Sequence, residues 1–238
     1  MATPRRFDLA QVRLWNHNVG VIAWNASRGL GEFEYEPTFL LLGLDLSPFM
    51  MPLRAGTFSF PGLNPDPFHG LPGLLADSLP DRYGHRLIDL WIARQGRAPG
   101  DFSPVERLCY MGTRAMGALE FQPALTPAPK RALPLEIDDL THLATEVLRH
   151  QGRWAVHLKG RKADALEAVI RVGTSAGGNR AKAIVAWNPS KGVLRSGQAA
   201  IPRGYQPWIL KLDGVNGTTL GDTKGLGRVE YAYHKMAV

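Results

Sequence analysis

Short apolar segments alternate with turn-forming residues in the first third of the chain, a pattern typical of antiparallel β-structure. Segments rich in β-branched and aromatic residues predict strands at 12–15, 19–24 and 32–36. Asparagine and glycine residues at 16–18 and 29–31 predict the turns between them. A proline-rich passage over 48–72 then predicts irregular structure.

Helical spacing begins near Pro80, where apolar residues recur every three to four positions up to Arg94. Asp77 and Asp81 lie around the predicted start of this helix. Two carboxylates in such proximity are also a feature of acid–base sites. Their position favours capping residues that interact with the helix dipole.

A capping box opens a second, short helix. Ser103 and Glu106 have the required spacing, Pro104 occupies the first helical position, and Gly112 ends the helix. The segment 118–123 then predicts a strand that a proline terminates.

The clearest boundary is a stretch with four prolines over 123–134, which predicts a stiff linker. We therefore expect an α+β protein with an N-terminal subdomain over 1–123, a linker over 124–134 and a second domain over 135–238. Within the second domain, periodicity predicts helices at 137–148, 164–171 and 227–238, and strands at 181–188, 193–198 and 206–213. The last helix has no stop signal, so we expect the sequence to be part of a longer protein.

Composition excludes several classes of protein. Hydrophobic residues make up 45% and charged residues 21%, as in ordinary globular proteins. The single cysteine, Cys109, excludes an intrachain disulfide and favours a reducing cytoplasm. No apolar run has the length of a membrane span, and no secretory signal precedes the first strand. The formal charge of +7 is scattered, apart from a dense cluster at 159–162, and is compatible with a solvated surface or with an acidic partner.

Three features of the second domain together suggest phosphate chemistry. A glycine-rich segment at 173–183 precedes a strand, Lys211 lies within the apolar segment 206–213, and Glu230 lies in the following helix. Backbone amides of such a segment bind phosphate oxygens. A lysine in a buried strand needs an anionic partner, and Glu230 is a candidate. This order matches a kinase small lobe, in which a loop covers the phosphates and a helix glutamate orients the strand lysine.

Each feature also has a simpler interpretation. The glycine-rich segment is compatible with a plain turn, Lys211 with an edge lysine that reaches water, and Glu230 with a solvated helix face. Four histidines (His85, His142, His150 and His157) show no metal-ligand spacing on one helix, and we predict no metal site from them.

Three blocks in the second domain, GTSAGGNRAKAIVAWN, GYQPWILKLDGV and GRVEYAYHKMA, resemble the HipA family of serine/threonine kinase toxins from bacterial toxin–antitoxin systems. The segments FHGLPGLLADSLPDRYGHRLID and SPVERLCYMGTRAMGALEFQP are similar to the N-terminal subdomain of that family. The resemblance implies a kinase-like fold, ATP and Mg²⁺ as cofactors, and transfer of the γ-phosphoryl group to a protein serine or threonine. It also implies an aminoacyl-tRNA synthetase as a substrate and a helix-turn-helix antitoxin as a partner, through which the protein contacts operator DNA.

The resemblance also assigns residues. Lys211 matches the lysine that contacts ATP, Glu230 the helix glutamate, and the loop match consists of Gly177, Gly178 and Asn179. Phosphorylation of a serine in that loop switches such kinases off, and the acceptor here is Ser175 or its neighbour Thr174. The catalytic aspartate, its nearby asparagine and the metal-binding aspartate belong to the C-terminal lobe of the family. They match no residue of this chain, so we expect residues 1–238 alone to be inactive.

Two alternatives of a different class stay open. The first is a non-catalytic protein-interaction or inhibitory module, in which the kinase-like lobe is vestigial. The second is direct binding of nucleic acid through the basic surface, alongside an antitoxin.

Overall fold

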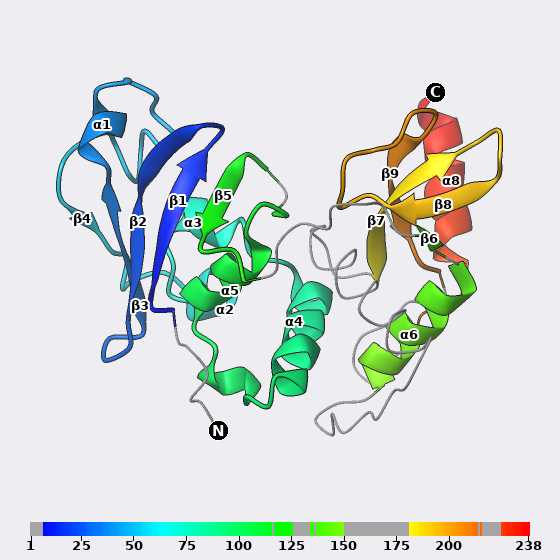
Figure 1. Cartoon of the computed structure of the whole chain (residues 1–238), viewed down its shortest axis with the longest axis horizontal. Helices are drawn as coiled ribbons and strands as arrows, with labels where there is room; N and C mark the ends of the chain where they lie inside the picture. Colours follow the sequence, from blue (N-terminus) through cyan, green and yellow to red (C-terminus); the bar gives the residue numbers. More distant parts are fainter. Residues whose placement is uncertain are drawn as a thin grey trace. The chain divides into compact units, whose positions relative to one another are not determined.

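The computed structural model of the chain describes residues 7–115, 117–125, 134–135, 137–149, 181–213, 215 and 225–238 (Figure 1). The chain divides into two compact units. The first comprises Met1–Leu79 and Arg97–Pro127, and the second comprises Pro80–Gly96 and Ala128–Val238. Both units combine helices with antiparallel sheets, which confirms the predicted α+β class.

The first unit is built on a five-stranded antiparallel sheet. Its strands are β1 (Leu9–Leu14), β2 (His17–Asn25), β3 (Leu30–Tyr35), β4 (Thr57–Phe58) and β5 (Leu119–Gln122), in the order β4-β3-β2-β1-β5. The three strands expected at the start of the chain and the one before Pro123 are thus confirmed. The first turn is tighter than predicted, because His17 already pairs with Leu14 and leaves only Trp15 and Asn16 in the loop.

The described residues of this unit form five helices, and most of them are single turns. They are α1 (Pro37–Leu40), α2 (Pro65–Phe68), α3 (Gly73–Ala76), a 3-10 helix (Pro99–Asp101) and α5 (Pro104–Met111). The prediction of irregular structure over 48–72 was therefore wrong for β4 and α2. Proline at the first helical position is compatible with a helix, because its missing N–H has no intrahelical partner there.

The capping box of α5 is confirmed. The Ser103 hydroxyl accepts a hydrogen bond from the Glu106 N–H at 3.1 Å, and the Glu106 carboxylate accepts one from the Ser103 N–H at 3.2 Å. Helix α5 packs against β1, β2 and β5 and ends at Gly112, as predicted.

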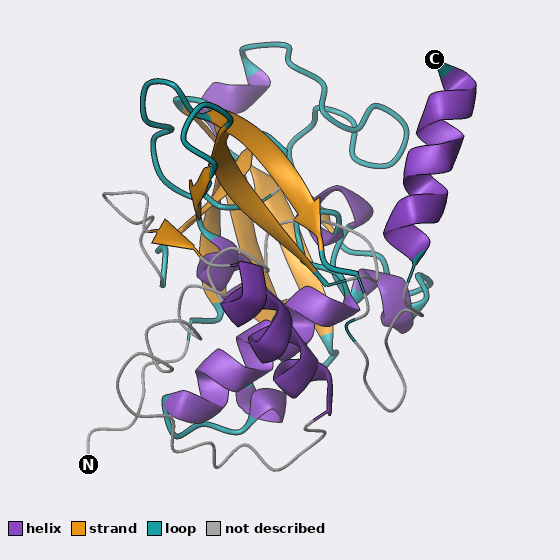
Figure 2. Cartoon of the chain, turned by 90° about the vertical axis from the view of Figure 1, so that its right-hand side faces the viewer, coloured by secondary structure: helices purple, strands orange, loops and turns teal. Residues whose placement is uncertain are grey.

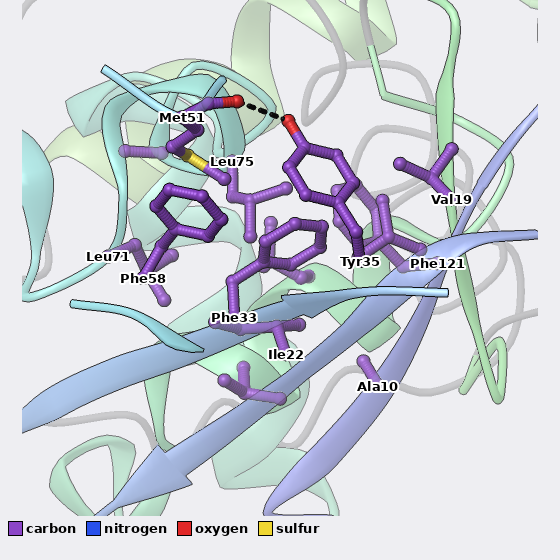
Figure 3. Packing of buried hydrophobic residues seen from close by; sticks show 14 of the residues in the cluster. Ala10, Val19, Ile22, Phe33, Tyr35, Met51, Phe58, Leu71, Leu75 and Phe121 are labelled. Atoms are coloured by element: carbon purple, nitrogen blue, oxygen red, sulfur yellow. Dashed lines mark hydrogen bonds between the residues drawn. The ribbon is translucent and has the colours of Figure 1, made fainter. Parts of the chain in front are cut away.

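Aromatic and aliphatic side chains from the sheet and from the segments over it form the core of the first unit (Figure 3). The ring of Tyr35 packs edge-on against Phe33 and against Phe58, and its hydroxyl donates a hydrogen bond to the Met51 carbonyl at 2.7 Å. This buried hydrogen bond fixes the proline-rich passage onto the sheet.

The second unit contains helices and a smaller antiparallel sheet. Its described elements are α4 (Arg82–Arg94), β6 (Pro134–Leu135), α6 (Ile137–Arg149), β7 (Lys182–Asn188), β8 (Val193–Ser196), β9 (Gln206–Lys211) and α8 (Leu226–Ala237). The strand order is β6-β8-β7-β9, and α4 packs against α6. Helix α8 is the one that ends at the C-terminus in Figure 2.

The second-unit strands and the helices at 137–148 and 227–238 confirm the predictions. The predicted helix at 164–171 and most of the predicted linker lie outside the described residues. Although α4 precedes the predicted linker in the sequence, it belongs to the second unit. The domain bounds over 1–123 and 135–238 remain a prediction. None of the helices among the described residues combines the length and apolar character that a bilayer span requires.

Candidate functional site

The glycine-rich segment lies almost wholly outside the described residues. Thr174, Ser175, Gly177, Gly178 and Asn179 are all in the part of the chain for which no structure is described. Their predicted roles in phosphate binding and autophosphorylation therefore stay predictions. The structure resumes at Ala181, immediately before β7, so the strand after the segment is present as expected.

The structure brings Lys211 and Glu230 together. Lys211 is the last residue of β9, Glu230 lies in α8, and their charged groups are 2.9 Å apart. The side chains are 50% and 47% exposed, respectively. A half-exposed ion pair of this kind contributes little to stability. The pairing orients the ammonium group, and its role in nucleotide binding remains a prediction.

Lys211 does not lie within a buried strand, and this premise of the sequence analysis was wrong. Among the described strands, β9 lies at the edge of its sheet beside β7, and its residues Gln206 to Ile209 are exposed. The apolar run around the lysine suggested a strand that is covered on both faces. Instead, β9 lies at the edge of the sheet, where fewer neighbours cover its side chains. Pro207 agrees with an edge position, because a central strand seldom tolerates proline.

The buried lysine of the sheet is instead Lys182, which sequence reasoning missed. It is the first residue of β7, is 4% exposed, and its ammonium group is 2.9 Å from a carboxylate oxygen of Asp81. Asp81 itself is 10% exposed. The only sequence signal was a lysine at the start of an apolar strand, and a partner 101 residues away leaves no local pattern.

The two lysines occupy opposite positions on neighbouring strands. Lys182 on β7 is the Cα partner of Lys211 on β9. The adjacent pair is hydrogen-bonded, since the Leu212 N–H donates to the Ala181 carbonyl at 2.9 Å. Lys182 and Lys211 therefore form a non-hydrogen-bonded pair, whose Cα atoms lie about 4.5 Å apart and whose side chains leave the same face of the sheet.

Each lysine has a carboxylate partner from a different helix. Asp81 lies at the start of α4, and Glu230 lies in α8. Like charges directly opposite each other in a sheet repel, and the two carboxylates offset this repulsion. The result is two cations on neighbouring strands, each with an anion from a helix, and we call Lys182 and Lys211 the lysine pair.

Asp81 has a second role that the sequence analysis predicted. One of its carboxylate oxygens accepts a hydrogen bond from the Gly84 N–H at 2.8 Å, which confirms Asp81 as the N-cap of α4. Asp77 was also expected to cap a helix start, and this was wrong. It follows α3 as its C-cap, and its backbone N–H donates to the Gly73 carbonyl.

Another aspartate holds α8 close to the end of β9. Both carboxylate oxygens of Asp213 accept hydrogen bonds from the Gly225 N–H, at 3.2 and 3.0 Å. Gly225 is the N-cap residue of α8, and Asp213 lies two positions after Lys211. This contact offsets an unpaired backbone donor at the helix start and brings α8 to the strand that carries Lys211.

Charge is distributed unevenly between the two units. The second unit holds 20 of the 28 lysine and arginine residues but only 11 of the 21 aspartate and glutamate residues, a formal charge of +9. The first unit is slightly acidic, with a formal charge of −2. The excess of positive charge therefore lies in the same unit as Lys182 and Lys211. Among the described residues, no group of histidine, cysteine or acidic side chains is arranged to hold a metal ion.

Comparison with known proteins gives a match to a family model. Residues 10–122 match the family model described as the HipA N-terminal domain. The match supports membership of the HipA family, and it covers just under half of the chain. It includes Asp81, whereas both lysines and Glu230 lie outside it. A search of the curated proteins found no match.

Proposed function

We propose that this chain binds ATP and forms the phosphate-binding part of a HipA-like serine/threonine protein kinase. The observation that carries the proposal is the ion pair between Lys211 at the end of β9 and Glu230 in α8. In protein kinases, a strand lysine contacts the nucleotide phosphates and a helix glutamate orients it. The order in the sequence, with the glycine-rich segment first, supports the same function.

Lys182 adds a second cation to the proposed site. Because it stands opposite Lys211 on the same face of the sheet, the two ammonium groups are suited to the several oxygens of a polyphosphate. The +9 charge of the second unit favours the approach of such an anion.

The residues of this chain would bind and orient the phosphates, and ATP supplies the phosphoryl group that is transferred. We propose a protein serine or threonine as the acceptor, an aminoacyl-tRNA synthetase being the substrate that the resemblance implies. Loop phosphorylation at Ser175 or Thr174 is the proposed means of self-inactivation. The described residues offer no cluster for Mg²⁺, whose ligands the family places in its C-terminal lobe. A helix-turn-helix antitoxin and a cytoplasmic location belong to the same proposal.

Nucleotide binding by residues 1–238 tests the proposal directly. Titration calorimetry with ADP should show binding by the parent chain, about tenfold weaker binding by Lys211→Met, and weaker binding by Glu230→Gln. Lys235→Met is the matched control, because Lys235 is a lysine of the same unit that lies in α8 and contacts the Tyr231 ring. Absence of ADP binding by the parent chain, or equal losses in Lys211→Met and Lys235→Met, would contradict the proposal.

The charge distribution favours a second candidate function, which is binding of nucleic acid by the basic second unit. A protein that neutralises several phosphates loses affinity steeply as salt rises. Titration of a DNA duplex at a series of salt concentrations measures this slope. Binding without a salt slope, or binding that requires a partner protein, would exclude direct nucleic-acid recognition by this chain.

A further inference from the structure

We propose that Asp81 is a positioning residue that holds the Lys182 ammonium group at the phosphate-binding face and ties it to the start of α4. This inference rests on the proposed nucleotide site, since it assigns Lys182 to that site. Asp81 itself touches no phosphate in this proposal and acts through the lysine.

The geometry of the carboxylate carries the inference. One oxygen accepts the Gly84 N–H at 2.8 Å and so caps α4, whereas the other oxygen is 2.9 Å from the Lys182 ammonium. The carboxylate is therefore fixed at one oxygen by the helix backbone and presents the other to the lysine. A shift of the first turn of α4 would move the partner of Lys182 with it.

Stability alone gives no reason for a charged pair at this position. Lys182 is 4% exposed and Asp81 is 10% exposed, so both charges lose most of their hydration. A buried ion pair is often no more stable than apolar residues of similar volume in its place. The next pair on the same face, Ile184 opposite Ile209, shows that apolar side chains are accommodated in this ladder. We therefore assign the lysine at this position to the proposed phosphate site, with Asp81 as its counter-ion.

The site of Lys182 also explains why it needs an oriented partner. It stands opposite Lys211, and two ammonium groups on one face repel each other. Asp81 offsets this repulsion from the α4 side, whereas Glu230 does so from α8. Each ammonium group thus has a carboxylate of its own, one from α4 and one from α8.

Two substitutions of Asp81 separate positioning from capping. Asp81→Ser retains a good N-cap but is too short to reach Lys182. Asp81→Glu retains the charge for Lys182 but is a poor N-cap. If Asp81 positions the lysine, then ADP affinity of the full chain should fall about tenfold in Asp81→Ser and change much less in Asp81→Glu. A purely structural role predicts the opposite order.

A double substitution completes the test. In the Lys182→Met background, Asp81→Ser should cause no further loss of ADP affinity, because the lysine through which it acts is absent. A further tenfold loss in that background would show that Asp81 acts independently of Lys182. This outcome, or unchanged affinity in Asp81→Ser, would overturn the inference.

Chemical labelling gives a readout that does not need nucleotide. Acetylation of Lys182 by acetic anhydride, measured by mass spectrometry, should increase in Asp81→Ser but not in Asp81→Glu. Labelling of the half-exposed Lys211 serves as the internal standard and should not change. If the parent chain does not bind ADP, the proposed function fails, and the labelling still decides whether Asp81 holds Lys182. Equal labelling of Lys182 in all three proteins would overturn the positioning role.

Discussion

Lys182 and Lys211 stand directly opposite each other on β7 and β9, yet the first side chain is 4% exposed and the second is 50% exposed. Their carboxylate partners differ in the same way, since the side chain of Asp81 is 10% exposed and that of Glu230 is 47% exposed. Two lysine–carboxylate ion pairs thus start from opposite positions on neighbouring strands, one with little exposure to solvent and one half-exposed. The two should differ in their contribution to stability far more than in their geometry.

We first predict that Lys182→Met lowers the free energy of unfolding by about 3 kcal/mol, because it leaves the Asp81 carboxylate buried without its ammonium partner. Lys211→Met should lower it by less than about 1 kcal/mol, since water solvates Glu230. The double substitution Lys182→Met with Asp81→Asn should recover most of the loss, because no buried charge remains. Urea denaturation measures all three, and equal effects of the two single substitutions would show that burial does not govern these pairs.

A second prediction concerns the buried ion pair that supports α5. The guanidinium of Arg97 contacts both carboxylate oxygens of Glu106, at 3.0 and 3.1 Å, and Glu106 is 1% exposed. Arg97→Met should therefore cost about 3 kcal/mol or more of unfolding free energy. Arg28→Met removes an exposed ion pair with Glu32 in the same unit and should cost less than about 1 kcal/mol. Urea denaturation of the two variants measures both losses. An equal loss of unfolding free energy in Arg28→Met and Arg97→Met would refute the prediction.

The sequence predicted the elements whose signals are local. The capping box of α5 needs only Ser103, Glu106 and the proline between them, and it forms as expected. The N-cap role of Asp81 is also local. The strands at the start of the chain followed from alternation and turn residues, because each pairs with a neighbour in sequence.

Tertiary contacts account for what the sequence did not predict. Burial of a lysine depends on which elements cover the sheet, and the local sequence does not show this. The apolar run around Lys211 therefore suggested a buried strand, although β9 is an edge strand. The buried lysine, Lys182, is paired by a residue 101 positions earlier, and no spacing rule links the two. The helices α1, α2 and α3 have four residues each, which is too short for a periodic pattern to develop.

A third prediction concerns the turn between β1 and β2. Trp15 has a φ of 52°, in the left-handed region that glycine adopts without strain, and its side chain is 66% exposed. Trp15→Gly and Trp15→Ala both remove the ring, but only glycine also removes the Cβ. We expect the glycine variant to be more stable than the alanine variant by about 1 kcal/mol, the reverse of the usual order. Thermal denaturation of the two variants tests this, and a more stable alanine variant would exclude strain at this turn.

The last prediction follows from Cys109, which is fully buried on α5. Burial, together with the smaller effect of the nearby Glu106 carboxylate, raises the pKa of the Cys109 thiol from 9.0 to about 12. Between pH 9 and 12 the unfolded chain therefore loses this proton while the native chain keeps it. The unfolded state is favoured as pH rises through this window, so the protein should lose about 1.4 kcal/mol of stability per pH unit from this group.

Cys109→Ala separates this effect from that of other alkaline groups. Burial raises the pKa of Tyr35 to about 12. Above pH 10 this tyrosine ionises in the unfolded chain first, which lowers the stability of both proteins equally. The alanine variant is expected to be less stable at pH 8 because it leaves a small cavity, but its stability should fall less steeply from pH 9 to pH 11. Urea denaturation at intervals of half a pH unit gives both slopes. Parallel slopes would mean that the thiol ionises equally well in the native and unfolded states, and that the packing around α5 admits water to Cys109.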